Sequence, residues 1–394
     1  MADTNVDVVI VGGGPAGLST ALHLQHASPD TKLVVLEAKA YPREKICAGA
    51  VGARAFRYLE RIHVEVDCPK VKIDAMALRI GSETVVTRVP DMGVVVRRIE
   101  FDHALAKVAL ARGIDVRDAT PVTSIDIHDD HVLVTTETGT RFRARCVVGA
   151  DGVAGITRRA TGFLPNKLRA QVVELDTEAH AGDHPRDTIV FDLTLRDLQG
   201  YFWDFPTIVK GEPLICRGAY VLHHLGPDSP KDRIARYLAD RGMDLARYRL
   251  KQYAERGFEP GEDMAKPRVL LVGEAAGIDI ATGEGIGQAI EYGYVAGPFL
   301  ARALEDDNFL FSTWRSHLEG RHVGWQLRIR HWCYEKFFGH NRDMVERMLP
   351  KMTALMKVGA QDFAGMPLSK LAIARGAAQF LSAWSREKMR PAES

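Results

Sequence analysis

The hydrophobic pattern at the start of the chain changes period after a cluster of glycines. Residues 6–11 have the sequence V-D-V-V-I-V, which is typical of a buried β-strand, and a helical pattern follows the glycines at 12–17. The next apolar run, K-L-V-V-L-E, occupies residues 32–37. Strand, turn, helix and strand in this order predict two parallel strands joined by a helix.

The central part of the chain alternates between helical and β patterns. Residues 101–109 carry apolar side chains at helical spacing, and Gly113 is typical of a helix end. Three short runs at 121–127, 131–137 and 141–145 predict a small antiparallel meander. The next run, 146–152, predicts a separate buried strand that ends in a turn.

The second half of the chain first gains β character and then becomes helical. Residues 169–222 contain aromatic β-like runs that predict a second sheet, and a helix is predicted near 231–241. A strand at 269–272 and a helix from about Gly285 come next. From residue 297 to the end the pattern is helical.

These patterns predict an α/β protein, α+β overall, with three parts. A Rossmann-like domain is expected from residues 1–168 together with 266–304. An antiparallel β-sheet domain that binds substrate is expected from 169–265. The remaining residues, 305–394, are expected to form a C-terminal helical region.

Composition narrows the class of protein. The 394 residues include 52 lysines and arginines against 51 aspartates and glutamates, so net charge favours neither nucleic acid nor an acidic membrane as a partner. Five cysteines without a C-x-x-C pair predict reduced thiols in a cytoplasm, with no metal site. The early first strand leaves no room for a signal peptide, and no run of 18 apolar residues exists. The oligomeric state stays open.

The glycine cluster has the spacing of a dinucleotide-binding turn. Gly12 permits the tight turn, Gly14 lets the backbone approach a diphosphate, and Gly17 lets the helix pack close to the sheet. The helix N-terminus offers free N–H groups to phosphate. Glu37, twenty residues after Gly17, can accept hydrogen bonds from a ribose diol. A bound dinucleotide is therefore predicted.

Four distant segments together resemble one family. They are the glycine turn, V-R-R-I-E-F-D at 96–102, G-A-D-G at 149–152 and G-E-A-A-G with G-E-G at 273–285. The chain resembles the FAD-dependent oxidoreductases of the p-hydroxybenzoate hydroxylase fold, and within them it is most similar to the geranylgeranyl reductases. The resemblance covers about residues 6–300 and implies non-covalently held FAD.

The resemblance assigns roles to single residues. Arg98 is expected to lie along the FAD, where its planar guanidinium suits a diphosphate; the alternative is a surface arginine that begins a helix. Asp151 and Gly152 match a turn beside the cofactor, although D-G is also common in ordinary turns. Glu274 stands where the family has an aspartate that binds the hydroxylated linker of FAD, and it is one methylene longer. The helix from Gly285 is expected to point its N-terminus at the flavin.

Two departures from the family pattern affect the substrate side. The family usually has a proline where this chain has Ile280 or Ala281, so the loop there is expected to differ in shape. The reductases commonly have a cysteine followed by two glycines, whereas Cys47 is followed by Ala48 and Gly49. Cys47 is a candidate catalytic residue beside the flavin, and the alternative is a cysteine that packs as a small apolar side chain.

The complete set of residues expected to bind FAD combines the motifs with their neighbours. It consists of Gly12, Gly14, Pro15, Ala16, Gly17, Glu37, Ala38, Arg43, Ala48, Arg98, Val122, Asp151, Gly152, Gly273, Glu274, Gly283, Gly285 and Ile286.

Aromatic residues mark the expected substrate side. G-Y-F-W-D-F-P at 200–206 resembles an aromatic motif of the reductases, and period two places Tyr201, Trp203 and Phe205 on one face of a strand. They form either a substrate wall or ordinary sheet core. Basic and aromatic residues interleave over 314–338; the solvated face of a packing helix is favoured there over a membrane surface. The amphipathic segment 371–384 is a candidate either to cover the pocket or to pair with another subunit.

The function predicted from these observations is that of an FAD-dependent oxidoreductase acting on an apolar or aromatic small molecule. NAD(P)H is expected to be a transient reductant, because the sequence contains no second dinucleotide fingerprint. Reduction of a carbon–carbon double bond is slightly favoured. The alternatives are a monooxygenase of an electron-rich substrate, a flavin halogenase and a non-catalytic FAD-binding accessory protein.

Overall fold

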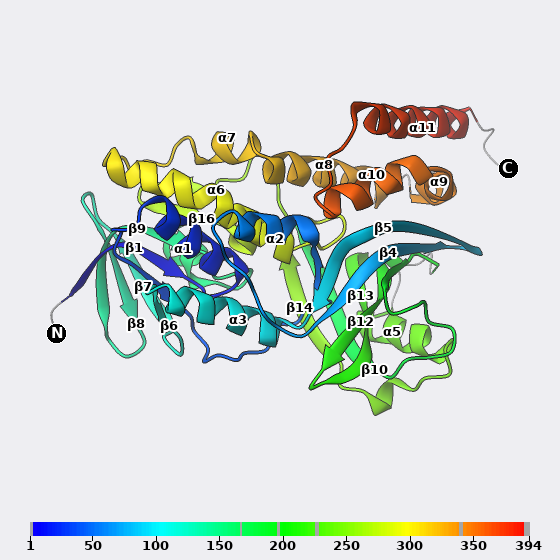
Figure 1. The fold of residues 1–394 in the computed structure, drawn as a ribbon, viewed down its shortest axis with the longest axis horizontal. Helices are drawn as coiled ribbons and strands as arrows, with labels where there is room; N and C mark the ends of the chain where they lie inside the picture. The colour runs from blue at the N-terminus through cyan, green and yellow to red at the C-terminus, as the bar shows by residue number, and fades with distance from the viewer. Residues whose placement is uncertain (1–2, 166–167, 195–197, 225–227, 339–341, 390–394) are drawn as a thin grey trace.

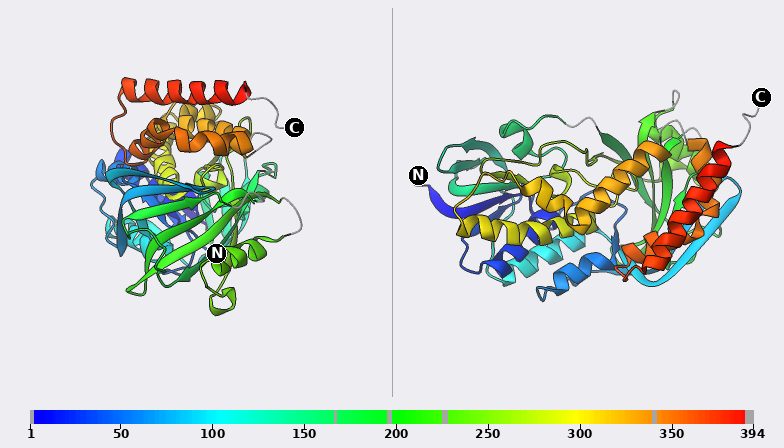
Figure 2. Two further views of the ribbon diagram at one scale, coloured as in Figure 1. Left: turned by 90° about the vertical axis from the view of Figure 1, so that its right-hand side faces the viewer. Right: turned by 90° about the horizontal axis from the view of Figure 1, so that it is seen from above.

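The computed structural model describes residues 3–165, 168–194, 198–224, 228–338 and 342–389. Two sheets lie at opposite ends of an elongated molecule, and helices from the last third of the chain run along one side of both (Figure 1). Both views in Figure 2 show these helices, α8 to α11, stacked outside the sheets. The predicted combination of a Rossmann-like unit, a second sheet and C-terminal helices is confirmed.

The first sheet is built around the parallel strands that the sequence predicts. Its order is β15-β16-β9-β1-β2-β6. The bounds are β1 (Thr4–Val11), β2 (Leu33–Leu36), β6 (Asp115–Arg117), β9 (Arg141–Gly149), β15 (Ala265–Lys266) and β16 (Val269–Leu271). Val8, Val9 and Ile10 are fully buried, which explains why this strand has a continuous apolar run.

Two helices beside this sheet pack closely against each other. Helix α1 (Pro15–Ala27) follows the glycine turn, and α6 (Ile286–Glu305) packs along it. A side chain at Gly293 would collide with Ser19, and one at Gly297 would come within 2.6 Å of His23. These two glycines therefore let α6 approach α1, which brings the loop before α6 next to the glycine turn.

The antiparallel meander is confirmed, with one correction. Strands β7 (Val122–Ile127) and β8 (Val132–Thr136) pair with each other, and β8 pairs with β9. The runs at 141–145 and 146–149 were expected to be separate, but they form the single strand β9. The segment R-F-R-A-R-C-V-V contains no turn-forming residue, so one strand pairs with the meander through β8 and with the parallel sheet through β1.

The second sheet contains more of the chain than the predicted 169–265. Its order is β14-β10-β13-β12-β11-β4-β5-β3. The bounds are β3 (Ala50–Gly52), β4 (Lys70–Ile80), β5 (Glu83–Val96), β10 (Arg169–Thr177), β11 (Thr188–Asp192), β12 (Leu198–Val209), β13 (Glu212–His224) and β14 (Lys251–Arg256). Strands β3, β4 and β5 were expected within the first domain. They join this sheet because β4 pairs with β11 across more than a hundred residues of sequence.

The remaining helices connect and cover the two sheets. They are α2 (Ala53–Glu60), α3 (Arg98–Ala111), α4 (Ile156–Ala160), α5 (Pro230–Ala239), α7 (Trp314–Glu319), α8 (His322–Phe337), α9 (Arg342–Met348), α10 (Thr353–Phe363) and α11 (Lys370–Lys388), with short 3-10 turns η1 (Leu245–Arg247), η2 (Gly273–Ala275) and η3 (Leu349–Lys351). Phe363 of α10 lies over Gly52, where a side chain would collide with it, and its ring would lie 3.1 Å from a side chain added at Gly93. In the described part of the chain, every helix is too short or too polar to span a bilayer.

Candidate active site

One large cavity runs from the glycine turn to the C-terminal helices. Its volume is about 1380 Å³. Single-ligand pockets are usually about 300–1,000 Å³, so this cavity has room for a cofactor and a substrate together. Its walls come from the first sheet, from the inner face of the second sheet and from α8, α10 and α11.

The glycine turn faces an empty space edged by two arginines. A side chain at Gly14 would find only the Nη2 atoms of Arg98 and Arg43 nearby, at 3.6 and 3.7 Å. Gly14 is also the N-cap of α1, and it leaves the first helical turn without a side-chain cap. Two guanidinium groups and a helix N-terminus around one space are suited to a diphosphate.

Three further glycines, Gly12, Gly17 and Gly273, allow close backbone packing around the turn. Gly12 has φ +107°, and a side chain there would collide with the backbone of Ala150. A side chain at Gly17 would collide with the Gly12 carbonyl, and one at Gly273 would come within 2.5 Å of Ala16. Gly17 and Gly273 do not line the cavity, and their contribution is close packing of the backbone.

Glu37 lies at the end of β2, beside the turn. Its Oε2 accepts a hydrogen bond from the Gly13 amide at 2.9 Å, and its Oε1 accepts one from the Lys39 amide at 3.1 Å. Arg43 forms an ion pair with the same carboxylate at 3.1 Å. Glu37 therefore fixes the turn and still lies on the cavity wall, where the ribose of a dinucleotide is expected.

Arg98 lies inside the protein and does not belong to the surface. Its Nε and Nη2 donate to the two oxygens of Asp102, both at 2.7 Å, and both side chains are buried. Arg43 lies 3.0 Å from Asp102 as well. The alternative of a surface arginine is therefore wrong: Asp102 holds Arg98 and Arg43 side by side on the wall.

Asp151 does two things at the end of β9. Its Oδ2 accepts hydrogen bonds from the amide and hydroxyl of Thr157, at 2.7 and 2.9 Å, and so it fixes the turn into α4. Its Oδ1 is buried and has no partner among the described residues. Asp151 lines the cavity, and a buried carboxylate oxygen without a partner is unusual enough to mark this turn as a candidate part of the site.

Glu274 lies on the opposite side of the same space. Its Oε2 accepts a hydrogen bond from the Tyr253 hydroxyl at 2.7 Å and lies 3.4 Å from Nζ of Lys45. Burial lowers the pKa of Lys45, and the Glu274 carboxylate opposes that shift. The longer side chain thus reaches residues of β14 and the 43–49 loop while it remains on the wall.

The loop that lacks the family proline is held by its own aspartate. Oδ1 of Asp279 accepts hydrogen bonds from the amides of Ala281 and Thr282, at 2.8 and 3.1 Å. The Ile280 carbonyl accepts from the Tyr220 hydroxyl at 3.2 Å, and the Thr282 carbonyl accepts from Tyr201 at 2.5 Å. These bonds fix Gly283 and Gly285 against the aromatic sheet.

The predicted aromatic wall is present on β12. Tyr201, Trp203 and Phe205 all line the cavity, so they share one face as their spacing predicts. The ring of Phe191 contacts those of Tyr201 and Phe205, with centroids 5.2 and 5.4 Å apart. The rings therefore belong to the core of the second sheet and to the cavity wall at once.

Cys47 also lies on the cavity wall, in surroundings that favour the protonated thiol over the thiolate. Burial raises the pKa of its thiol, and the nearby Arg98 opposes the shift. Its backbone is hydrogen-bonded to Glu174, a buried carboxyl whose own pKa burial raises to about 7. The side chain also packs against the apolar core, so both sequence interpretations of this cysteine remain compatible with its position.

Glu255 is a wall residue that the sequence did not reveal. It lies on β14, and its Oε1 accepts a hydrogen bond from the Tyr220 hydroxyl at 2.9 Å. Burial raises the pKa of this carboxyl well above its usual value, and the Glu274 carboxylate adds to the shift. A single glutamate in K-Q-Y-A-E-R carries no motif, so only the fold identifies it as a proton-holding group.

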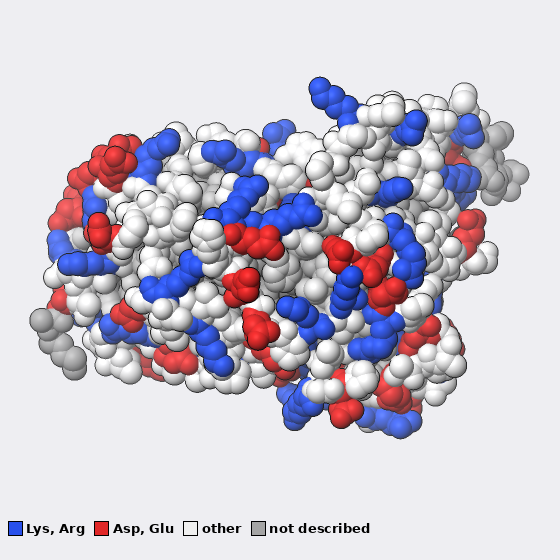
Figure 3. All heavy atoms as spheres, in the orientation of Figure 1, with Lys and Arg blue, Asp and Glu red and all other residues white. Residues whose placement is uncertain are grey.

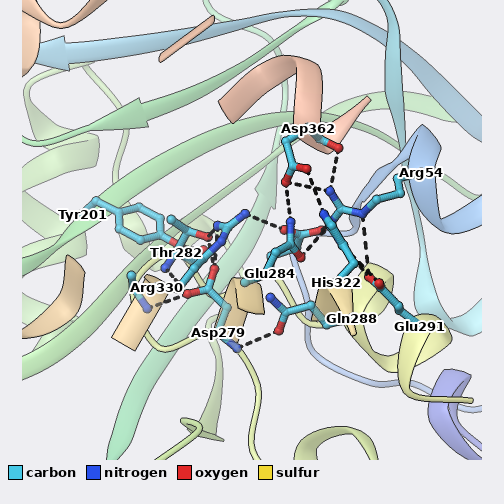
Figure 4. A network of polar contacts seen from close by, with 12 residues as sticks. Arg54, Tyr201, Asp279, Thr282, Glu284, Gln288, Glu291, His322, Arg330 and Asp362 are labelled. Atoms are coloured by element: carbon cyan, nitrogen blue, oxygen red, sulfur yellow. Dashed lines mark hydrogen bonds and ion pairs between the residues drawn. The ribbon is translucent and has the colours of Figure 1, made fainter. Parts of the chain in front are cut away.

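A second group missed by the sequence is a buried ionic network at the far side of the cavity (Figure 4). Arg54 of α2 lies 2.9 Å from Asp362 of α10 and 3.5 Å from Glu284. Arg330 of α8 lies 2.9 Å from Glu284 and 2.7 Å from Asp279. The network joins the C-terminal helices to the loop at 279–285.

His322 gives this network a pH dependence. Its Nδ1 lies 3.0 Å from Glu291 and its Nε2 3.0 Å from Asp362, so both nitrogens act as donors in the charged ring. Burial disfavours that charge, but the two carboxylates outweigh it and raise the pKa to about 9. Because the folded pKa is above the ordinary value of 6.5, the stabilisation is complete below pH 6.5 and is lost as pH rises through 9.

We therefore expect the free energy of unfolding to fall by about 1–2 kcal/mol between pH 6.5 and 9, a value discounted because the side chain is one-third exposed. Urea denaturation at a series of pH values measures it. His322→Gln should be less stable at pH 6 and should lose this part of the pH dependence. An unchanged slope in the variant would contradict the assignment.

Comparison with known proteins identifies the class of enzyme. The FAD binding domain family FAD_binding_3 matches residues 5–191. Digeranylgeranylglycerophospholipid reductase 2 of Methanosphaera stadtmanae is 24% identical, over 81% of this chain and 84% of that protein. Menaquinone reductase of Mycobacterium tuberculosis is 26% identical, over 81% of each. The chain is an FAD-dependent oxidoreductase, and over most of its length it is similar to proteins named as prenyl-lipid and menaquinone reductases.

The fold of this oxidoreductase is shared with a solved structure. A geranylgeranyl bacteriochlorophyll reductase-like protein of Thermoplasma acidophilum superposes with a TM-score of 0.77 at 20% identity, over 98% of this chain and 99% of that one. The predicted family resemblance and the predicted cofactor, FAD, are both confirmed.

The residues on the wall fit FAD. Of the residues predicted to bind the cofactor, all except Gly17 and Gly273 line the cavity. The space before Gly14 suits the diphosphate, Glu37 suits the ribose, and Asp151 and Gly152 line the same cavity. Their individual contacts with FAD remain predictions.

Proposed function

We propose that this flavoprotein reduces carbon–carbon double bonds in a long apolar substrate of the prenyl-lipid or prenyl-quinone class. The observation that carries the proposal is the size and lining of the cavity beyond the glycine turn. Past the aromatic wall, the lining is mostly aliphatic and aromatic up to the C-terminal helices, with Glu284, Arg330 and Asp362 of the ionic network as its charged part. The apolar residues include Met76, Leu78, Ile189, Leu349, Met352, Leu355 and Met356.

A large, mostly apolar cavity suits a long chain more than a compact aromatic ring. Binding such a chain is driven by removal of its surface from water, about 0.8 kcal/mol per buried CH₂ group. The two relatives carry names that specify a digeranylgeranyl lipid and menaquinone, and both names denote reductases. Their chemistry supports the same class of substrate here.

The proposed chemistry divides between cofactor and protein. FAD, when bound, would supply hydride-transfer chemistry, with NAD(P)H as the transient reductant. Arg43 and Arg98 would hold its diphosphate, and the aromatic wall would orient the apolar chain. Saturating a double bond takes a hydride and a proton, and the carboxyl of Glu255 would provide the proton from its Oε2, since its Oε1 accepts the Tyr220 hydrogen bond.

Anaerobic turnover tests the proposal. The FAD-loaded protein is reduced with NADPH or NADH without oxygen and then mixed with detergent-dispersed geranylgeranylglycerol phosphate or menaquinone. We expect reoxidation of the flavin and a product heavier by two hydrogens for each saturated bond, measured by mass spectrometry.

Other outcomes identify the alternatives. Product that forms only with oxygen and carries an added oxygen atom would make the protein a monooxygenase, and a requirement for halide as well would make it a halogenase. A flavin that no nicotinamide or other donor reduces would favour a non-catalytic accessory protein. Each of these results would contradict double-bond reduction.

A further inference from the structure

The cavity reaches the surface between α8 and α11. Trp325, Ile329 and Trp332 of α8 line the cavity, and so do Ile373 and Leu381 of α11. All five are also exposed, with 52% of Trp325, 43% of Trp332 and 61% of Leu381 accessible to solvent. Side chains that are both cavity wall and outer surface form the rim of an opening.

The rim residues share helix faces. Positions 325, 329 and 332 are four and three residues apart on α8, and positions 373 and 381 are eight apart on α11. The ring of Trp332 contacts Phe380 of α11 at a centroid distance of 6.0 Å, which brings the two helices together beside the opening. We name this set, with the exposed Leu371, the mouth face. These side chains are apolar and exposed, and all except Leu371 line the cavity where it opens.

Charge is distributed unevenly along the chain, and the mouth face lies in its basic part. Residues 321–394 contain thirteen lysines and arginines against six aspartates and glutamates, whereas residues 1–320 contain 39 against 45. Exposed basic side chains around the mouth include Arg328, Lys357, Lys370 and Arg375. In Figure 3, blue and white atoms predominate at the upper right, where Figure 1 places α10 and α11.

We propose that the mouth face docks on the surface of a membrane that contains anionic lipid. The proposal rests on the proposed function, because a prenyl lipid or quinone would pass from the bilayer into the channel without crossing water. Tryptophan is favoured at membrane–water interfaces, and the apolar rim residues would enter the headgroup region. The surrounding basic side chains would be attracted to anionic headgroups, each by about 1 kcal/mol.

This assignment reverses the expectation for the interleaved basic and aromatic segment. The sequence favoured the solvated face of a packing helix over 314–338. In the structure Trp314 is fully buried, but Trp325 and Trp332 face outward at the opening of the cavity. The fold separates the core aromatic residue from the two that face the solvent.

Co-sedimentation of the full-length FAD-loaded protein with vesicles tests the proposal. Vesicles of phosphatidylcholine mixed equally with phosphatidylglycerol are compared with vesicles of phosphatidylcholine alone. Leu381→Asp should lower binding to the mixed vesicles by about tenfold, because one apolar anchor is lost and a like charge is added. Lys370→Glu with Arg375→Glu should lower binding to the mixed vesicles by at least about tenfold and leave binding to the neutral vesicles unchanged.

The matched control is Leu110→Asp, on α3. Leu110 is also an exposed helical leucine, 52% accessible, and it does not line the cavity. The Leu110→Asp substitution should change vesicle binding by no more than about twofold. Circular dichroism and the melting temperature show that each variant remains folded.

The outcomes separate docking from function. Equal vesicle binding by wild type and Leu381→Asp would overturn the docking proposal. It would also be overturned if wild type did not bind vesicles and instead formed a dimer, seen in sedimentation velocity, that Leu381→Asp dissociates. Reduction of a detergent-dispersed substrate without vesicle binding would overturn docking alone. Vesicle binding without double-bond reduction would contradict the proposed function and leave docking supported.

Discussion

Replacement of Gly14 by valine is expected to weaken FAD binding by at least about 100-fold. The valine methyl groups would fill the space between the turn and the guanidinium groups of Arg98 and Arg43, where the diphosphate is expected. Hydrogen bonds to a charged group contribute about 1.5–3 kcal/mol each, so loss of two accounts for a change of this size. Gly14 has φ −84°, which valine adopts without strain, so the apoprotein should fold normally.

Flavin fluorescence titration of the apoprotein measures this effect. The matched control is Gly182→Val, at an exposed glycine outside the cavity, which should bind FAD like wild type. The melting temperature of both apoproteins should stay within a few degrees of wild type. Wild-type FAD affinity in Gly14→Val would exclude the glycine turn as the diphosphate site.

Substitution of Glu255 by glutamine is expected to slow substrate reduction by about 100-fold or more, the usual contribution of a positioned proton donor. The amide keeps an oxygen that can accept the 2.9 Å hydrogen bond of Tyr220, so the local structure should persist, but it cannot deliver a proton. Flavin reduction by NAD(P)H should be unaffected, because that step takes no proton from this group. Stopped-flow measurement of the two half-reactions separates them.

The pH profile supplies an independent readout. Burial holds the pKa of Glu255 well above its usual value, so the wild-type second half-reaction should become slower as pH rises through that raised pKa. Glu255→Gln should lose this dependence. Cys47→Ala is the comparison, since Cys47 lies on the same wall and its thiol is also protonated. A greater loss in Cys47→Ala than in Glu255→Gln would assign the proton to the cysteine.

The raised pKa of Glu255 also makes the stability of the folded protein depend on pH. The folded state binds a proton at Glu255 more tightly than the unfolded state does, so it holds more protons above the ordinary pKa of 4.5. Stability from this group therefore falls as pH rises from 4.5 towards the folded pKa, and His322 adds a further loss up to about pH 9. The site keeps its buried carboxyl despite this loss, which is expected of a functional group.

The sequence by itself determined the parts of the site whose chemistry depends on local backbone. The dinucleotide-binding turn is made of features that are close in sequence: the glycines at 12, 14 and 17, the following helix and the acid at 37. Their spacing is specific for this kind of turn. The aromatic face of β12 also follows from a period of two. These features predicted the Rossmann-like unit, the cofactor and the aromatic wall because each is encoded within one or two neighbouring elements.

Only the tertiary structure decided the features that depend on distant pairing. The pairing of β4 with β11 placed β3, β4 and β5 in the second sheet. The packing of α8 and α10 on α2 assembled the network around Arg54 and His322. Glu255 acquired a proton-holding role by being buried beside Tyr220 and Glu274, and the mouth face arose where α11 lies against α8. Burial and long-range contact set these properties, and neither has a local period or spacing that a single sequence displays.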